Sequence, residues 1–174
     1  MIVNSIDSIL SHFDDKKRIV LVGKAASGKD YARKLLQGLG YQYQTSFTTR
    51  PMRTGEVHGQ DYYFMPEFKF LELIKTKFFY EHVQFNGWYY GTSKAQMRIE
   101  NCVFIMTPAG LAHLTEYDRK DSLVVYFDID EEIRKERLKL RSDADTVDRR
   151  LAADALDFDG FSNYDLIVND PNFQ

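Results

Sequence analysis

The sequence is poor in cysteine, in repeats and in long apolar runs, and each shortage excludes a class of protein. Its one cysteine, Cys102, cannot form an internal disulfide or a thiolate zinc cluster. We expect Cys102 to be a buried strand residue, because an apolar run follows it. No run approaches the length of a membrane span, and no repeat, low-complexity tract or linker is visible. The four histidines lack the close spacing of metal ligands.

An excess of charge of one sign is also missing. The chain has 23 Lys and Arg residues against 26 Asp and Glu residues, which gives a formal net charge of -3. This balance argues against a large basic surface for nucleic acid, so any basic site must be local and suited to a small anion. The N-terminus lacks a basic region followed by an apolar stretch. We therefore expect a cytoplasmic protein whose partners include neither nucleic acid nor membrane.

The sequence does contain an alternation of apolar runs and amphipathic segments. With 174 residues and 44% hydrophobic side chains, it predicts one compact domain with a substantial core. Helical spacing covers residues 4–14, 29–38, 66–76, 108–117, 131–140 and 147–156. Strand-like runs cover residues 19–22, 61–64, 78–85, 88–90, 102–106, 123–128 and 166–168.

The order of these elements predicts an α/β fold, a parallel sheet with helices on both faces. Residues 46–92 are aromatic-rich and contain the hairpin signal Asn86 and Gly87, so they predict a small mixed α/β lobe inserted into the core. The single domain, residues 1–174, would then have a core of about 1–45 and 93–174.

Residues 23–30 read Gly-Lys-Ala-Ala-Ser-Gly-Lys-Asp and stand between an apolar strand and a helix. In this context the pattern predicts a phosphate-binding loop, and with it a parallel sheet of the P-loop NTPase type. Small residues let backbone N–H groups converge on phosphate oxygens, the helix N-terminus adds a positive dipole, and Lys29 reaches the β and γ phosphates. The alternative is a glycine turn with a surface lysine. The predicted ATP contacts in the loop are Gly23, Lys24, Ala25, Ala26, Ser27, Gly28, Lys29 and Asp30.

Asp30 departs from the usual pattern, in which Ser or Thr stands at this position and contacts Mg²⁺. A carboxylate also binds Mg²⁺, directly or through water, so Asp30 is the candidate metal residue. Its alternative role is to cap the helix that follows the loop. Certain other P-loop kinases, among them viral deoxynucleotide kinases and phosphomevalonate kinase, resemble this chain in carrying Gly-Lys-Asp.

Two further segments closely resemble the guanylate kinase family. Residues 46–64 read Ser-Phe-Thr-Thr-Arg-Pro-Met-Arg-Thr-Gly-Glu-Val-His-Gly-Gln-Asp-Tyr-Tyr-Phe, and residues 81–92 read Glu-His-Val-Gln-Phe-Asn-Gly-Trp-Tyr-Tyr-Gly-Thr. The resemblance extends from about Arg18 to Asp170. It implies that the phosphate of the acceptor GMP is held by Arg50, Arg53, Tyr62 and Tyr90. It also implies that guanine is contacted by Ser46, Glu81 and Thr92.

The chemistry of these side chains suits the implied roles. Guanidinium groups capture phosphate in a bidentate manner, and tyrosine hydroxyls donate to the same oxygens. A carboxylate such as that of Glu81 accepts from both the N1–H and the N2–H donors of guanine, and a small hydroxyl donates to O6. Without the resemblance, the arginines would be interpreted as surface charges and Glu81 as an exposed cross-strand partner.

The resemblance also implies a short arginine-bearing lid at about 137–150, within the core. The arginines of the family's lid match Arg137, Arg141 and Arg150, which would close over the transferring phosphoryl group and neutralise its charge. The alternative for each of them is a charged helix face. Asn169 matches a family position near the adenine of ATP.

A second departure follows the strand that ends near Met106, where the family usually has an acidic stretch. Here the chain continues into Thr107 and Pro108 without a carboxylate. We hypothesise that Asp30 compensates by taking over part of the metal-holding role, and that selectivity for guanine is weaker.

The reaction implied by the resemblance is ATP-dependent phosphorylation of GMP, dGMP or both to the diphosphate, with Mg²⁺, by a monomer or a homodimer. Two alternatives stay open. The first is a nucleotide kinase with a broader or different nucleoside monophosphate acceptor, because a carboxylate is missing near Thr107. The second is a non-catalytic guanylate kinase-like binding module, which would be expected to have a degraded phosphate loop.

Overall fold

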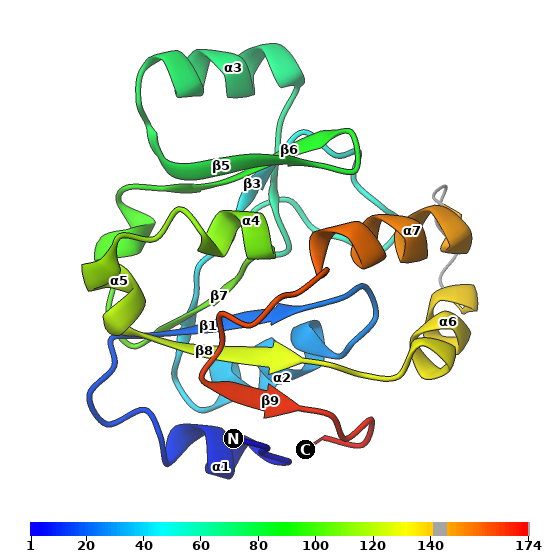
Figure 1. Cartoon of the computed structure of the whole chain (residues 1–174). Coiled ribbons are helices and arrows are strands. Elements are labelled where there is room, and N and C mark those ends of the chain that lie inside the picture. Colours follow the sequence, from blue (N-terminus) through cyan, green and yellow to red (C-terminus); the bar gives the residue numbers. More distant parts are fainter. Residues whose placement is uncertain (141–145, 174) are drawn as a thin grey trace. The chain divides into compact units, whose positions relative to one another are not determined.

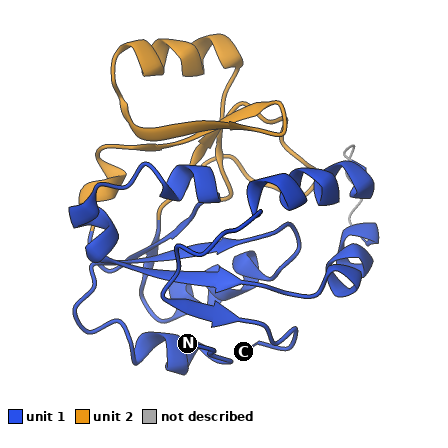
Figure 2. Cartoon of the chain, in the orientation of Figure 1, with its two compact units in different colours: residues 1–43, 100–174 blue, residues 44–99 orange. Residues whose placement is uncertain are grey.

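The computed structural model describes residues 1–140 and 146–173. The chain divides into two compact units, one formed by Met1–Tyr43 with Glu100–Gln174 and the other by Gln44–Ile99 (Figure 2). The sequence placed the boundaries of the inserted lobe at about 46–92. Each unit has a sheet of its own (Figure 1).

The first unit is built on a five-stranded sheet in the order β2-β7-β1-β8-β9. Every neighbouring pair in it is parallel, which confirms the predicted fold class. The strands are β1 Arg18–Gly23, β2 Gln42–Tyr43, β7 Cys102–Ile105, β8 Ser122–Phe127 and β9 Leu166–Val168. Cys102 is fully buried in β7, as predicted.

Helices cover both faces of this sheet, because the strand residues are apolar on both sides. The helices are α1 Ile6–Leu10, α2 Lys29–Gly38, α4 Pro108–Leu111, α5 Glu116–Lys120, α6 Glu131–Lys139 and α7 Val147–Asp157. Ile19 and Leu21 of β1 join α1 and α2 in one core cluster. On the opposite face, where α7 lies (Figure 1), Tyr126 of β8 stacks on Phe158, the residue that directly follows α7.

Two helix predictions are wrong in their extent. Residues 4–14 form a helix only over α1. The helix predicted over residues 108–117 is instead two short helices, α4 and α5. The cause is local: Thr115 accepts a hydrogen bond from the backbone N–H of Asp118 and thereby starts a new helix. Polar residues at such positions favour a cap over continuation of the preceding helix.

The second unit holds a four-stranded mixed sheet in the order β4-β3-β6-β5. Its elements are β3 Phe47–Thr48, β4 Tyr63–Phe64, α3 Glu67–Lys75, β5 Phe79–Phe85, β6 Trp88–Ser93 and the 3-10 helix η1 Gln96–Arg98. Asn86 and Gly87 connect β5 to β6, and both have positive φ angles, 53° and 83°. Two such residues form the hairpin turn that their sequence predicts.

A β-bulge in β5 gives the two faces of this sheet different characters. Phe79 pairs with Ser93, whereas Glu81 pairs with Thr92, so one extra residue lies between the two pairs. Phe79 therefore faces α3, where its ring stacks on Phe70 at 4.3 Å between centroids. Glu81 is turned to the other face, which is polar.

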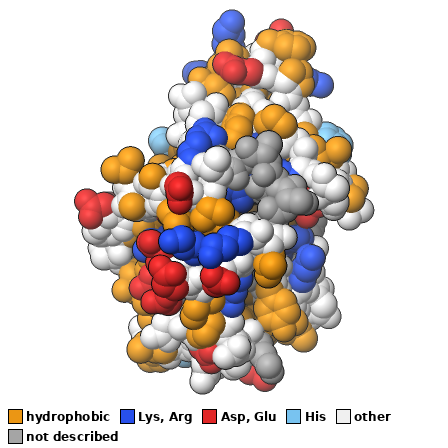
Figure 3. Space-filling view, turned by 90° about the vertical axis from the view of Figure 1, so that its right-hand side faces the viewer, with side chains coloured by type: hydrophobic (Ala, Val, Ile, Leu, Met, Phe, Trp, Pro, Cys, Tyr) orange, Lys and Arg blue, Asp and Glu red, His pale blue; other side chains and the backbone are white. Residues whose placement is uncertain are grey.

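Surface charge on the side of the molecule that carries α6 is mixed. Figure 3 shows Lys and Arg side chains beside Asp and Glu side chains there. Among the described residues, none of the helices is both long enough and apolar enough to span a membrane.

Candidate functional site

The predicted phosphate loop connects β1 to α2 in the first unit. Gly23 closes the strand where no side chain fits, because a Cβ there would lie 2.7 Å from the carbonyl oxygen of Phe127. Gly28 is the N-cap of α2 and has a φ of 104°, a conformation that glycine adopts without strain. Ala26 has a φ of 59°, which costs a non-glycine residue about 1–2 kcal/mol.

Lys29, the first residue of α2, folds back over the loop. Its Nζ donates to the carbonyl oxygens of Gly23 at 2.5 Å and of Lys24 at 2.8 Å. The positive charge is therefore held against the loop itself, at the N-terminal end of a ten-residue helix whose dipole also favours an anion. The loop thus stands between a buried strand and a helix, as its glycine and lysine spacing predicts, and a phosphate contact of Lys29 stays a prediction.

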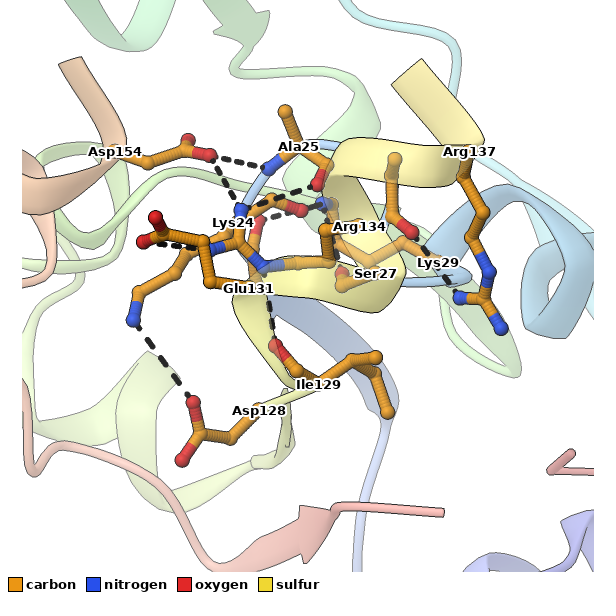
Figure 4. A network of polar contacts seen from close by, with 12 residues as sticks. Lys24, Ala25, Ser27, Lys29, Asp128, Ile129, Glu131, Arg134, Arg137 and Asp154 are labelled. Carbon is orange, nitrogen blue, oxygen red and sulfur yellow. Dashed lines mark hydrogen bonds and ion pairs between the residues drawn. The ribbon is translucent and has the colours of Figure 1, made fainter. Parts of the chain in front are cut away.

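Side chains of α6 and α7 hold the same loop from outside (Figure 4). Asp154 of α7 accepts a hydrogen bond from the backbone N–H of Ala25 at 2.9 Å. Arg134 of α6 donates to the same carboxylate oxygen at 3.1 Å. Arg137, one turn further along α6, donates to the carbonyl oxygen of Ala26 at 3.1 Å. These contacts fix two consecutive residues of the loop.

Asp154 and Arg134 are both buried, with exposed fractions of 4% and 2%. Burial raises the pKa of Asp154, although the Ala25 N–H and the charges of Lys29 and Arg134 favour its ionised form. Asp157, one turn later on α7, is half-buried, and burial together with the charge of Asp154 raises its pKa to about 6. Asp154 is thus the carboxylate of α7 that contacts the loop.

Asp30 does not cap α2, because the N-cap is Gly28 and Asp30 is the second helical residue. Its side chain is 67% exposed and forms an ion pair with Arg33, Oδ1 to Nε, at 3.6 Å. Asp128, which directly follows β8, is a second acidic residue near the loop, since its Oδ1 lies 4.0 Å from Nζ of Lys24.

No group of three or more His, Cys, Asp and Glu residues that could hold a metal ion occurs among residues 1–140 and 146–173. Mg²⁺ in nucleotide sites is commonly held by one or two carboxylates together with substrate phosphates. Asp30 and Asp128 fit that donor set. Thr107 is the N-cap of α4, and its Oγ1 accepts from the N–H of Gly110 at 3.0 Å.

The other residues predicted for the donor side have different surroundings. Arg137 contacts the loop and also donates to the carbonyl oxygen of Pro171 at 2.7 Å. Arg150 is buried on α7, with 6% of its surface exposed. Asn169 is exposed just after β9. Arg141, together with most of the predicted lid, lies outside the described residues.

The polar face of the second unit gathers the residues predicted for the acceptor. Glu81 and Thr92 are directly paired between β5 and β6. Extending the registers of β3 by one residue places Ser46 beside Thr92 on one side and beside Tyr62 on the other. Four side chains from neighbouring strands thus form a row, which we call the polar row: Tyr62, Ser46, Thr92 and Glu81.

Arg50 lies at the tyrosine end of the polar row. It is 5% exposed, and its guanidinium carbon lies 5.3 Å from the ring centroid of Tyr62. The Tyr62 and Tyr90 rings are 6.0 Å apart. Burial raises the pKa of Tyr90, although the charges of Arg50 and Arg53 favour its ionised form. The structure therefore brings the four predicted phosphate residues together.

Glu56, to which the sequence assigned no role, organises the two arginines. Its Oε1 accepts from Nη2 of Arg50 at 2.6 Å, and its Oε2 accepts from the backbone N–H of Arg53 at 2.7 Å. Burial opposes the charged form of each partner, but the ion pair outweighs it. The pKa of Glu56 is lowered and that of Arg50 is raised.

Glu81 is buried, with 6% of its surface exposed. Burial raises its pKa to about 7, although hydrogen bonds from Thr92 favour the carboxylate. Hydrogen-bond donors on a ligand would stabilise the ionised form of Glu81 and so offset the effect of its burial.

Arg134, Asp154 and Glu56 are contact residues that the sequence did not single out. The signal for Asp154 is a carboxylate on the buried face of a helix, one turn after Arg150. The signal for Glu56 is an acidic residue in an otherwise basic loop. Neither signal identifies its partner, because each partner is fixed only by the fold.

Comparisons with known proteins find similar sequences and a similar fold. A family model described as Guanylate kinase matches residues 15–173. The guanylate kinase of Sus scrofa is 30% identical over 163 residues, covering 86% of this chain and 82% of the relative. That of Wolinella succinogenes is 31% identical over 161 residues, covering 86% and 74%. A crystal structure of guanylate kinase from Anaplasma phagocytophilum has the same fold, with a TM-score of 0.66 and 22% identity over 90% of this chain and 78% of that chain.

Proposed function

The chain belongs to the guanylate kinase family, and we infer that it is a nucleoside monophosphate kinase that transfers the γ-phosphoryl group of ATP to GMP, giving ADP and GDP. We propose dGMP as a further acceptor, because the side chains assigned to the acceptor contact its base and its phosphate rather than its sugar. The observation that carries the residue assignment is the polar row, with a carboxylate at one end and Arg50 at the other.

On the acceptor side, Glu81 accepts from the N1–H and N2–H groups of guanine, and Ser46 and Thr92 donate to or orient the base. Arg50, Arg53, Tyr62 and Tyr90 hold the phosphate. The attacking oxygen belongs to that phosphate, whose second pKa is about 6, so it is largely ionised at neutral pH. No protein group is required as a general base, and catalysis rests on alignment and charge neutralisation.

On the donor side, the loop from Gly23 to Asp30 receives the phosphates of ATP, and its backbone N–H groups and the N-terminus of α2 stabilise their charge. Lys29 exchanges its carbonyl contacts for the β and γ phosphates. We assign charge neutralisation during transfer to Arg137, Arg141 and Arg150, and an adenine contact to Asn169.

For Mg²⁺ we propose Asp30 as the principal protein group, with the nucleotide phosphates supplying further oxygens. When bound, the ion neutralises charge that develops on the transferring phosphoryl group. Asp30 must leave Arg33 to reach it, and its 67% exposed side chain has the freedom to do so.

The alternatives gain no support from these observations. A non-catalytic binding module would not require the loop, yet Gly23, Gly28 and Lys29 are all present between β1 and α2. A broader acceptor range would require a weaker guanine contact, whereas Glu81 is buried and paired with Thr92. The cytoplasmic location and the choice between monomer and homodimer stay predictions.

The direct experiment uses ATP labelled at the γ phosphate. Incubation with GMP is expected to give labelled GDP, and incubation with dGMP labelled dGDP. Lys29→Met is the matched inactive variant, because it removes the cation while leaving the buried core of the first unit unchanged. Absence of labelled diphosphate with either acceptor, or equal labelling by the wild type and Lys29→Met, would contradict the proposal.

A further inference from the structure

The phosphate loop contains one strained residue, and three side chains from outside the loop surround it. Ala26 has a φ of 59°, in the left-handed region that glycine tolerates and alanine does not. Such a conformation persists only where surrounding contacts determine it, and it is common at functional sites. Contacts around Ala26 must therefore hold its backbone in this conformation.

Such contacts are made to the backbone of Ala25 and of Ala26. Asp154 accepts from the N–H of Ala25 at 2.9 Å, and Arg134 lies 3.5 Å from the carbonyl oxygen of Ala25. Arg137 donates to the carbonyl oxygen of Ala26 at 3.1 Å. Figure 4 shows Asp154 and Arg134 pointing toward each other at the loop.

Arg134 and Asp154 form a buried unit rather than a surface pair. Their exposed fractions are 2% and 4%, and one Asp154 oxygen accepts from both Arg134 and Ala25. Arg134 is fixed further by donating Nε to the carbonyl oxygen of Ile129 at 3.0 Å. A buried ion pair adds little net stability compared with apolar residues of the same volume, so a pair placed against the loop calls for a role beyond stability.

We propose that Arg134 and Asp154 are a positioning pair that holds the strained turn at Ala26 in the shape that binds the phosphates of ATP. They do not touch the nucleotide. They act through the backbone of Ala25: Asp154 holds its N–H and Arg134 lies at its carbonyl oxygen. The backbone of Ala25 in turn orients the following N–H groups toward the phosphates. The inference rests on the proposed function in that the loop is taken to bind ATP, but it does not depend on which nucleotide is the acceptor.

The first test is the dissociation constant for ATP, measured by isothermal titration calorimetry without an acceptor. Asp154→Asn is expected to weaken ATP binding by about tenfold or more, which corresponds to about 1.4 kcal/mol of lost loop support. The Michaelis constant for GMP should change by less than about twofold. Unchanged ATP binding in Asp154→Asn would overturn the proposal.

Asp165→Asn is the matched control. Asp165 also accepts from a backbone N–H, that of Val124 at 2.8 Å, and from an arginine, Arg119 at 3.0 Å, but it has no contact with the loop. This variant is expected to lose stability without losing ATP affinity. Equal loss of ATP affinity in both variants would show a general effect of destabilisation and would also overturn the proposal.

The second test addresses strain directly. Glycine at position 26 adopts the same φ at little cost. In the Ala26→Gly background, Asp154→Asn should weaken ATP binding by less than about threefold, because a relaxed turn needs less support. A loss of the same size in both backgrounds contradicts the assigned role.

If Asp154→Asn fails to fold, the double variant Arg134→Met with Asp154→Leu replaces the pair by apolar side chains, an exchange that buried ion pairs tolerate well. A folded double variant should show the same loss of ATP affinity of about tenfold or more, and wild-type affinity in it would overturn the proposal. Because these measurements use ATP alone, a failure of GMP phosphorylation would be detected separately by the transfer assay.

Discussion

Phe79 and Glu81 stand two positions apart on β5 but face opposite sides of their sheet. Phe79 pairs with Ser93 and packs on Phe70, while Glu81 pairs with Thr92 and joins the polar row. In a regular strand, residues two apart share a face. The bulge between them is therefore what allows an aromatic strand to present a carboxylate to a ligand.

Replacing Glu81 by glutamine should damage recognition of guanine rather than the fold. An amide cannot accept hydrogen bonds from both N1–H and N2–H, and a hydrogen bond to a charged group contributes about 1.5–3 kcal/mol. The Michaelis constant for GMP should rise by about tenfold to about 150-fold, and discrimination against AMP should fall. Steady-state kinetics with both acceptors measure this. A glutamine variant that discriminates as well as the wild type would exclude Glu81 from base recognition.

Acceptor use should depend on pH through Glu81. Burial raises its pKa to about 7, so below that pH the free enzyme carries a neutral acid that cannot accept from both guanine donors. The Michaelis constant for GMP should therefore rise as pH falls from about 8 to about 6. The acceptor phosphate, with a second pKa of about 6, titrates in the same range. Glu81→Gln controls for it, because only the contribution of Glu81 should disappear in that variant.

The same group affects stability with a defined sign. Its folded pKa of about 7 lies above the unfolded value of 4.5, so the folded state holds a proton that the unfolded state releases. The free energy of unfolding should decrease as pH rises from about 4.5 to about 7, by on the order of 3 kcal/mol from this group alone. Chemical denaturation at several pH values, compared between wild type and Glu81→Gln, measures the difference. A decrease of equal size in both proteins would show that other groups cause it.

Arg50 should be needed for the acceptor and not for the donor. Arg50→Ala is expected to cost about 2–4 kcal/mol in kcat/KM for GMP, since a charged phosphate contact is lost and Glu56 is left without its partner. Glu56→Gln should cost less, because Arg50 keeps its charge but loses its anchor. In both variants the dissociation constant for ATP should stay within about twofold of wild type. A matching loss of ATP affinity would place Arg50 outside the acceptor site.

Asp30 gives a prediction about metal dependence. If it holds Mg²⁺, Asp30→Ser should lower activity and shift the Mg²⁺ titration to higher concentration. Thr107→Asp in that background should recover part of the loss, and it should keep α4 intact because Asp caps helices as well as Thr does. Undiminished turnover and an unchanged Mg²⁺ titration in Asp30→Ser would remove Asp30 from the metal site.

Local signals in the sequence predict much of this architecture. The bounds of α2 and the Asn86–Gly87 turn follow from residue types at fixed spacing, and so does the alternation that makes the first sheet parallel. The break between α4 and α5 does not follow from such signals. Thr115 can either continue the preceding helix or cap a new one, and the residue types alone do not decide between these two conformations.

The site could be predicted only in part, for a related reason. Its acceptor residues stand in contiguous motifs, whereas Arg134 and Asp154 stand 20 positions apart and meet only through tertiary structure. A buried ion pair also has no periodic apolar signature that would reveal it. The sequence gives no sign of the bulge that orients Glu81 either. A bulged strand and a regular strand contain the same types of residue, so residue types cannot distinguish them.

An acceptor panel measures whether this chain phosphorylates guanine nucleotides in preference to other nucleoside monophosphates. ADP release would be measured with GMP, dGMP, AMP, CMP, UMP and their deoxy forms under identical conditions, and kcat/KM compared. GMP or dGMP should give the highest value, exceeding that of AMP by at least about tenfold, which is the effect of about 1.4 kcal/mol of differential binding. Equal kcat/KM for AMP and GMP in the unmodified protein would contradict the account.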